Sequence, residues 1–276
     1  MEAVYKIHEL TPPHYDSAAK LWSLVFGDNE ALVREFYRLF GKQSGFACCA
    51  TANGEVVAAA YCPAGTDYIA ADGTAEKGAY LYAVATHPDH RKQQLAMHCC
   101  RWLQENTFRN TGSLLFTKPS EESLYPWYEE KINAVPALGG RRIELTGTAS
   151  APLSMQPLSH EAYFRLRNEL LCCRAHVRHS IEWLEWESLL HKAYGGGFYT
   201  IGDSIADLYF DGTSLQINEL LPHPTAAQAD SLIQGIMAAM GAEACVCTVF
   251  GDEKYVSVAH EDGNLPQNAW FGPCYG

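Results

Sequence analysis

The segment from residue 82 to residue 96 holds the residue types that can bind a phosphate group. It reads YAVATHPDHRKQQLA, an apolar strand-like stretch, a polar loop and the start of an amphipathic helix near Gln94. The first amides of a helix have no partner within the helix, and the helix dipole adds positive potential there. Arg91 and Lys92 stand next to these amides. The segment therefore predicts a site for an anion such as a pyrophosphate.

This segment resembles the acetyl-CoA motif of the GNAT superfamily of N-acetyltransferases, a V-x-V strand and a proline before an Arg/Gln-x-x-Gly-x-Gly/Ala loop. The matching residues are Val84, Pro88, Arg91, Leu95 and Ala96. The resemblance implies that the backbones of Val84, Ala85 and Thr86 pair with the pantetheine arm like an added strand. It also implies that the pyrophosphate of acetyl-CoA, the expected cosubstrate, contacts Arg91, Lys92, Gln93, Gln94, Leu95 and Ala96.

Gln94 departs from the family pattern, which has glycine at this position because a bare backbone lets phosphate oxygens approach closely. We expect Gln94 to present its N–H if its side chain turns outward and its φ angle stays negative. The alternative is a non-catalytic acyl-CoA-binding or regulatory module with a degraded site.

A second segment, SLYPWYEEKINA, resembles the GNAT helix whose tyrosine protonates the departing CoA thiolate. Tyr128 matches that position, and Tyr125 is a weaker candidate. The Gly-Phe pair that usually follows is absent, and two half-buried tyrosines in an aromatic patch are the alternative interpretation. The resemblance further implies that Ser120 and Glu121, in the loop after the strand SLLFT, contact CoA.

The expected reaction is direct transfer of an acetyl group from acetyl-CoA to a primary amine of a small molecule or a peptide. An amine must lose a proton before it attacks the thioester. No residue stands out as the base, and the candidates that stay open are Glu76, Tyr80, Tyr82, Glu121 and Glu122.

The elements that position these residues follow the same order in both halves of the chain: strand, two helices, three strands, helix, strand. In the first half, Asn53-Gly54 predicts a hairpin, and residues 62–77 are expected to form a loop. We predict an α+β fold with a mixed central sheet flanked by helices, arranged as two tandem GNAT-like domains at 1–147 and 155–276. The second domain is expected to be degenerate, because the loop before its helix at residue 225 has neither Arg nor Lys.

The composition of the chain narrows the possible partners, cellular location and cofactors. Acidic residues outnumber Lys and Arg by 32 to 20, which argues against a nucleic-acid partner. No apolar run approaches the roughly 20 residues of a membrane span, and the N-terminus lacks a secretory pattern, so we expect a soluble cytoplasmic protein with no membrane partner. The ten cysteines are expected to be free thiols, and the His-x-x-His pairs lack a suitably spaced carboxylate, so no metal is expected. The oligomeric state stays open, a homodimer included.

Overall fold

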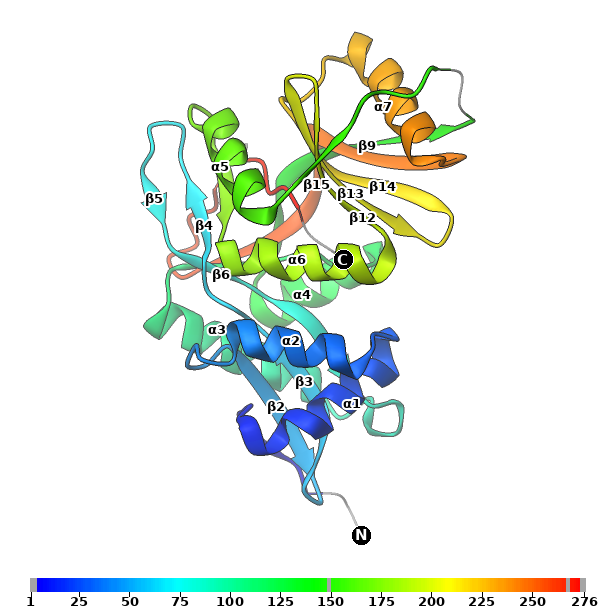
Figure 1. Cartoon of the computed structure of the whole chain (residues 1–276). Coiled ribbons are helices and arrows are strands. Elements are labelled where there is room, and N and C mark those ends of the chain that lie inside the picture. The colour runs from blue at the N-terminus through cyan, green and yellow to red at the C-terminus, as the bar shows by residue number, and fades with distance from the viewer. Residues whose placement is uncertain (1–3, 148–149, 267–268, 274–276) are drawn as a thin grey trace.

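The computed structural model describes residues 4–147, 150–266 and 269–273 of the 276-residue chain. Figure 1 shows two lobes, with most of the first half of the chain, from blue to green, below most of the second half, from green to red. Helix α2 (Glu30–Phe40) and helix α6 (Ile181–Tyr194) lie against each other where the lobes meet.

The first lobe is built on an antiparallel sheet with helices on both faces. Asn53 and Gly54 have φ angles of 52° and 87°, the left-handed turn that the Asn-Gly pair predicts, and they join the two central strands. Alternate residues of these strands enter two apolar cores, one under the first two helices and one under α3. The elements are β1 (Lys6–Glu9), η1 (Pro12–His14), α1 (Tyr15–Phe26), α2, β2 (Ala47–Ala52), β3 (Glu55–Tyr61), β7 (Tyr82–Thr86), η2 (Pro88–His90) and α3 (Leu95–Asn110), in the strand order β1-β2-β3-β7.

The stretch GAYLYAVAT, which leads into the phosphate-binding loop, divides between two sheets. Its first part, β6 (Gly78–Tyr80), pairs in parallel with β8 (Leu114–Thr117), and the Leu81 N–H still donates to the Phe116 carbonyl at 2.8 Å. Its second part, β7, pairs instead with β3 and has a bulge at Ala83, whose φ angle is +47°. The chain therefore separates from β8 after Leu81 and opens a gap between β7 and β8.

The second lobe follows the predicted element order, except that the short strand β11 separates its two helices. Ser180 caps α6, its hydroxyl accepting from the Trp183 N–H, and helix α7 covers one face of the sheet. The elements are β10 (Gln156–Leu158), α5 (His160–Leu171), β11 (His176–His179), α6, β12 (Gly196–Ile201), β13 (Ser204–Asp211), β14 (Ser214–Leu221), α7 (Ala226–Met240) and β15 (Ala244–His260).

Two long strands tie the lobes together. Strand β9 (Val135–Thr146) pairs antiparallel with β15 over most of their lengths. The start of β15 pairs with β14 inside the second lobe, whereas its end, Ser257–His260, pairs with β8 of the first lobe. In Figure 1 the orange-red β15 runs from the upper lobe into the middle of the molecule. The predicted boundary between residues 147 and 155 divides the sequence into two halves, but the hydrogen-bonded sheet continues from one half to the other.

One local expectation was wrong. Residues 62–77, expected to be a loop, contain the strands β4 (Thr66–Ile69) and β5 (Ala75–Glu76), and β4 is stabilised by pairing with the distant β11.

The segment SLYPWYEEKINA forms helix α4 (Tyr125–Ile132), which follows the short η3 (Glu122–Leu124). Pro126 lies in the first turn of α4, where a missing N–H costs nothing.

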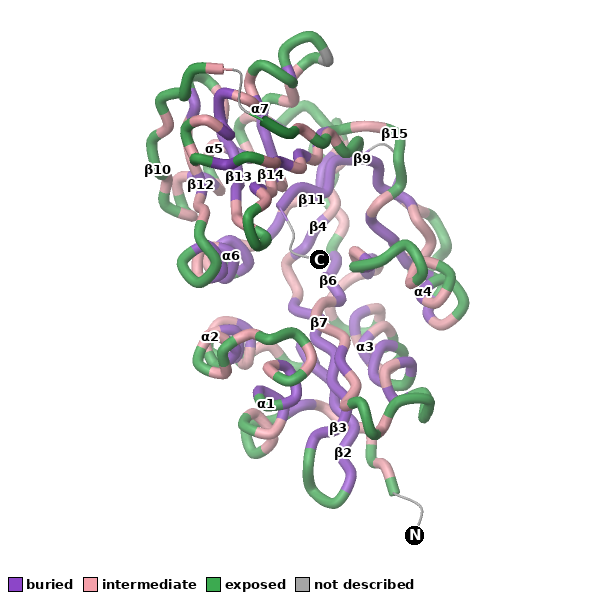
Figure 2. Tube along the Cα trace, turned by 90° about the vertical axis from the view of Figure 1, so that its right-hand side faces the viewer, coloured by how far each residue is buried: buried purple, intermediate pink, exposed green. Residues whose placement is uncertain are grey.

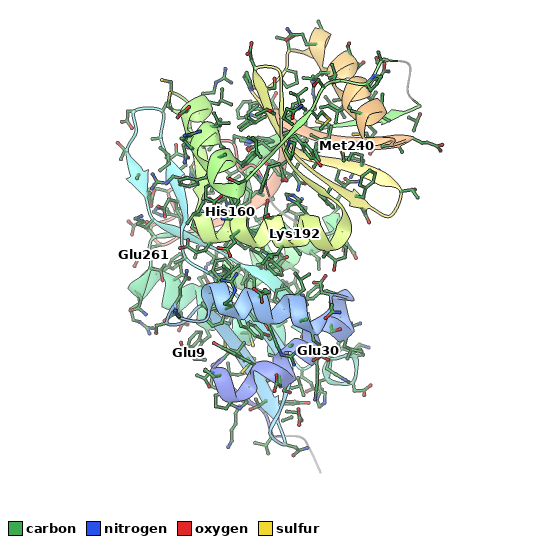
Figure 3. The ribbon with its side chains drawn as sticks, viewed as in Figure 1. Glu9, Glu30, His160, Lys192, Met240 and Glu261 are labelled. Carbon is green, nitrogen blue, oxygen red and sulfur yellow. The ribbon has the colours of Figure 1, made fainter. Side chains whose placement is uncertain are left out.

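The contact between the lobes is apolar and aromatic. Trp22 and Phe36 of the first lobe meet Trp186 of the second, with ring centroids 6.3 and 5.2 Å apart. Figure 2 shows the buried positions running along β2 and β3 and through the second sheet, and Figure 3 shows side chains filling the space between α2 and α6. Because one buried cluster draws on both lobes, we infer that they pack as one body.

Nine cysteines lie in the described part of the chain, and all nine are free. Seven are buried, as expected of small apolar residues, whereas Cys172 and Cys173 are exposed. No helix among the described residues is long and apolar enough to cross a membrane.

Candidate functional site

The loop predicted to bind phosphate lines a cavity of about 220 Å³, called here the phosphate pocket. All six residues assigned to the pyrophosphate lie on it. The lining consists of Thr86, His90, Arg91, Lys92, Gln93, Gln94, Leu95, Ala96, Met97, Trp127 and Lys131. The sequence had not pointed to Trp127 and Lys131, which come from α4; only the packing of α4 beside α3 brings them there.

The start of α3 presents unpaired backbone donors to this pocket. The helical hydrogen bonds begin at His98, whose N–H donates to the Gln94 carbonyl at 3.1 Å. The amides of the three residues before it have no acceptor within the helix. Among the described residues, no side chain caps the helix at Gln94. The pocket also has three cationic side chains, of which Arg91 and Lys92 are exposed and Lys131 is paired with Glu130 at 2.5 Å. Free amides and clustered cations are what an anionic phosphate group needs.

The expected backbone conformation of Gln94 was wrong. Its φ angle is +58°, in the left-handed region, and Lys92 two residues earlier is at +65°. Side chains rarely adopt this conformation, which glycine reaches without strain. Gln94 thus keeps the backbone shape of a glycine loop, while its side chain is exposed to solvent.

Strand β7 connects the phosphate pocket to a second cavity. Thr86 and Ala85 pair with Ala58 and Ala59 of β3, whereas Val84 lies at the bulge and has no ladder partner there. Thr86 lines the phosphate pocket and Val84 lines the second cavity. On the other edge of β7 the strand has separated from β8, so an extended ligand can lie along this edge between the two cavities.

The second cavity, about 270 Å³, is called the Tyr128 cavity. Tyr128 is buried on α4, and its hydroxyl interacts with that of Thr117, which donates to the Leu81 carbonyl at 3.2 Å. Burial raises the pKa of Tyr128 above its ordinary value, with a smaller contribution from Cys100. The side chain is therefore a protonated hydroxyl at neutral pH, the form a general acid requires.

The structure separates the other predicted contacts. Ser120 lines the Tyr128 cavity, but Glu121 lies outside it, on a neighbouring cavity between the lobes. Tyr125, the weaker candidate acid, donates its hydroxyl to the Tyr255 carbonyl at 2.8 Å instead of facing the Tyr128 cavity.

The candidate bases are also distributed. Tyr80 and Tyr82 line the Tyr128 cavity, whereas Glu122 lines the cavity between the lobes. Glu76 is hydrogen-bonded to Ser113 and, at 2.5 Å, to His260, outside both the phosphate pocket and the Tyr128 cavity.

Asp28 is the carboxylate that sequence reasoning missed. It lines the Tyr128 cavity just after α1, where Gly27 ends the helix in a left-handed conformation. The Trp22 Nε1–H donates to one carboxylate oxygen at 2.6 Å, and the Tyr194 hydroxyl donates to the other. Because Tyr194 comes from α6 of the second lobe, no local sequence pattern could have placed it beside Asp28.

The corresponding loop of the second lobe lacks these features. Helix α7 begins with a capping box, in which Thr225 and Gln228 satisfy each other's backbone amides. The loop before it offers His223 in place of a permanent cation. The second lobe therefore does not offer, at this position, the combination of free helix amides and permanent cations that the first lobe offers.

Comparison with known proteins places this geometry in a family. Residues 6–129 match the model of the acetyltransferase (GNAT) domain. Similar solved structures include a GCN5-related N-acetyltransferase from Kribbella flavida (15% identity, 94% of this chain and 70% of that one, TM-score 0.62). Eis1 from Mycobacterium abscessus is 14% identical, with 94% of this chain and 74% of that one covered and a TM-score of 0.63. A probable N-acyltransferase from Enterococcus faecalis V583 is 9% identical, with 94% of this chain and 73% of that one covered and a TM-score of 0.65. A search of curated proteins found no match. The chain has the GNAT fold, and its residues 6–129 are a domain of the GNAT acetyltransferase family.

Proposed function

We propose that the protein transfers an acetyl group from acetyl-CoA to a primary amine. One observation carries the proposal: strand β7 joins the phosphate pocket at one end to the Tyr128 cavity at the other. Pyrophosphate oxygens accept from the amides at the start of α3, assisted by Arg91 and Lys92. The pantetheine arm lies along the free edge of β7, and the thioester reaches the bulge at Ala83 and Val84.

At the bulge, the unpaired backbone supplies the donor that acyl transfer requires. The amine nitrogen attacks the thioester carbonyl, and the negative charge that develops on its oxygen is stabilised by the N–H of Val84, which has no ladder partner. Collapse of the tetrahedral intermediate breaks the carbon–sulfur bond. The Tyr128 hydroxyl then gives its proton to the leaving thiolate.

Asp28 gives the amine a binding group in the same cavity. Its carboxylate attracts the ammonium form of the acceptor, and the surrounding rings of Trp22, Tyr82 and Tyr194 suit a cation on their faces. Asp28 also offers a place for the proton that the ammonium must lose before attack. This assignment replaces the open list of bases with one residue.

The test is a two-step measurement on the full-length protein. Calorimetry with acetyl-CoA determines whether the coenzyme binds, and release of free CoA thiol with a panel of primary amines determines whether it is consumed. Saturable binding with turnover of at least one amine supports the proposal. Binding without turnover of any amine supports the acyl-CoA-binding module, which the strained Gln94 favours, and absence of binding overturns both.

A further inference from the structure

A cavity of about 550 Å³ lies between the lobes and is larger than the phosphate pocket or the Tyr128 cavity. The loop after β8 closes one side of this interlobe cavity, and the sheet of the second lobe closes the other. Lys118 and Ser120 line both this cavity and the Tyr128 cavity, so the two spaces meet at these residues.

The floor of the interlobe cavity is an incomplete sheet edge. Strand β9 occupies one edge of β15, from Ala244 to Val258. The opposite edge pairs with β14 as far as Cys247 and with β8 from Ser257 onward. Between them, residues 248–254 pair with neither β14 nor β8, and the Tyr255 carbonyl accepts a hydrogen bond from the Tyr125 hydroxyl. An open strand edge binds extended chains through main-chain hydrogen bonds.

The lining side chains point to a polar ligand of mixed charge. Alternation along β14 and β15 turns most of their apolar residues toward α7, whereas Gln216, Asn218 and Thr248 line the cavity together with Val246. Charges of both signs surround them. The charged lining residues are Lys118, Glu121, Glu122, Arg141, Arg142, Glu253 and Lys254. Neutral hydrogen-bonding groups, both signs of charge and a free strand edge together match the chemistry of a peptide.

We propose that the acceptor is a peptide, whose N-terminal amine enters the Tyr128 cavity and whose following residues lie extended in the interlobe cavity. The proposal rests on the proposed function for the fate of the amine. It assigns to the second lobe the binding of the acceptor chain, which is how a lobe without a phosphate loop serves the reaction.

The experiment compares alaninamide with tetra-alanine amide, because both have the same N-terminal residue and only the longer one extends between the lobes. Ligand-observed NMR measures binding to the full chain saturated with CoA, and thiol release measures turnover with acetyl-CoA. We expect the tetrapeptide to bind at least tenfold more tightly and to gain in kcat/KM mainly through a lower KM. The variant Gln216→Trp fills the interlobe cavity and is expected to remove this advantage, while Gln156→Trp, at an exposed position on β10, keeps it.

If the Gln216→Trp variant does not fold, Thr248→Phe places a bulky side chain in the same cavity from β15. For either variant, an unchanged affinity for acetyl-CoA shows that the first lobe is intact. Equal binding of the two acceptors by the wild-type protein overturns the proposal, as does a length advantage that survives both obstructing variants. Because binding is measured without turnover, length-dependent binding with no CoA release contradicts the proposed reaction and leaves the peptide site standing. CoA release at the same rate with both acceptors supports the proposed reaction and contradicts the peptide site.

Discussion

The left-handed backbone of Gln94 predicts that replacing this residue with glycine stabilises the protein. Holding an L-residue in this conformation costs about 1–2 kcal/mol, which glycine does not incur. Glycine in turn has greater freedom in the unfolded chain, which costs about 0.4–1 kcal/mol. For Gln94→Gly the difference is a gain of roughly 0.5–1 kcal/mol in the free energy of unfolding of this region, because φ there is +58°.

The same energy governs the phosphate pocket, since the amides of Leu95 and Ala96 face it only while Gln94 keeps its left-handed backbone. With about 1.4 kcal/mol per factor of ten, Gln94→Gly is expected to tighten acetyl-CoA binding roughly two- to fivefold. Gln94→Val, which puts a β-branched side chain at positive φ, is expected to weaken it. Calorimetry gives the affinities, and denaturant titration gives the stability.

The control is Gln93→Gly, because Gln93 is the adjacent exposed glutamine and is not among the residues with positive φ. There, glycine only adds freedom to the unfolded chain, so stability should fall by about 0.4–1 kcal/mol. If the two glycine variants shift stability and affinity in the same direction, Gln94 is not strained and the reasoning fails.

Three further predictions concern the reaction and the fold. Tyr128→Phe should lower kcat by about 100-fold or more with little change in acetyl-CoA affinity. Because burial raises the pKa of Tyr128, its acid form persists as the pH rises. A fall in kcat that is centred below pH 9 and is lost in the Phe variant would contradict the assignment. Asp28→Asn should raise the KM of cationic amines about fivefold, equivalent to about 1 kcal/mol of ion pairing, whereas an unchanged KM removes Asp28 from acceptor binding. A chain ending at residue 147 should aggregate, because β8 loses its β15 partner, and a monomer with native-like circular dichroism would refute this.

The first lobe's fold and its phosphate loop could be predicted because their signals are local. The Asn53-Gly54 turn and the strand-loop-helix order around Arg91 are each encoded within a few residues. The position of Gln94 was read correctly, but its φ angle was not, since the choice between strain and a remodelled loop depends on how α3 packs in the core.

Features built from distant segments were beyond sequence reasoning. Strand β4 looked like a loop because its stabilising partner, β11, lies about a hundred residues further along the chain. Asp28 and Lys131 were not among the predicted site residues. The hydroxyl that orients Asp28 belongs to Tyr194 of the second lobe, and Lys131 reaches the phosphate pocket only because α4 packs beside α3. In each case the residue type was visible, and its surroundings were not.

The pairing of β15 with strands of both lobes is another feature that local sequence patterns could not predict, and it bears on function. Residues 141–147 and 244–250 each satisfy a local β pattern, but no local signal indicates that β15 continues to His260 and pairs with β8. Yet this continuation holds the loop after β8 against the sheet of the second lobe, where Ser120 and Lys118 connect the Tyr128 cavity to the interlobe cavity. A second lobe that retained only the fold of the first would need no such connection. Because β15 pairs with β8 at Thr117, whose hydroxyl contacts that of Tyr128, the geometry of the proposed acid depends on both halves of the chain.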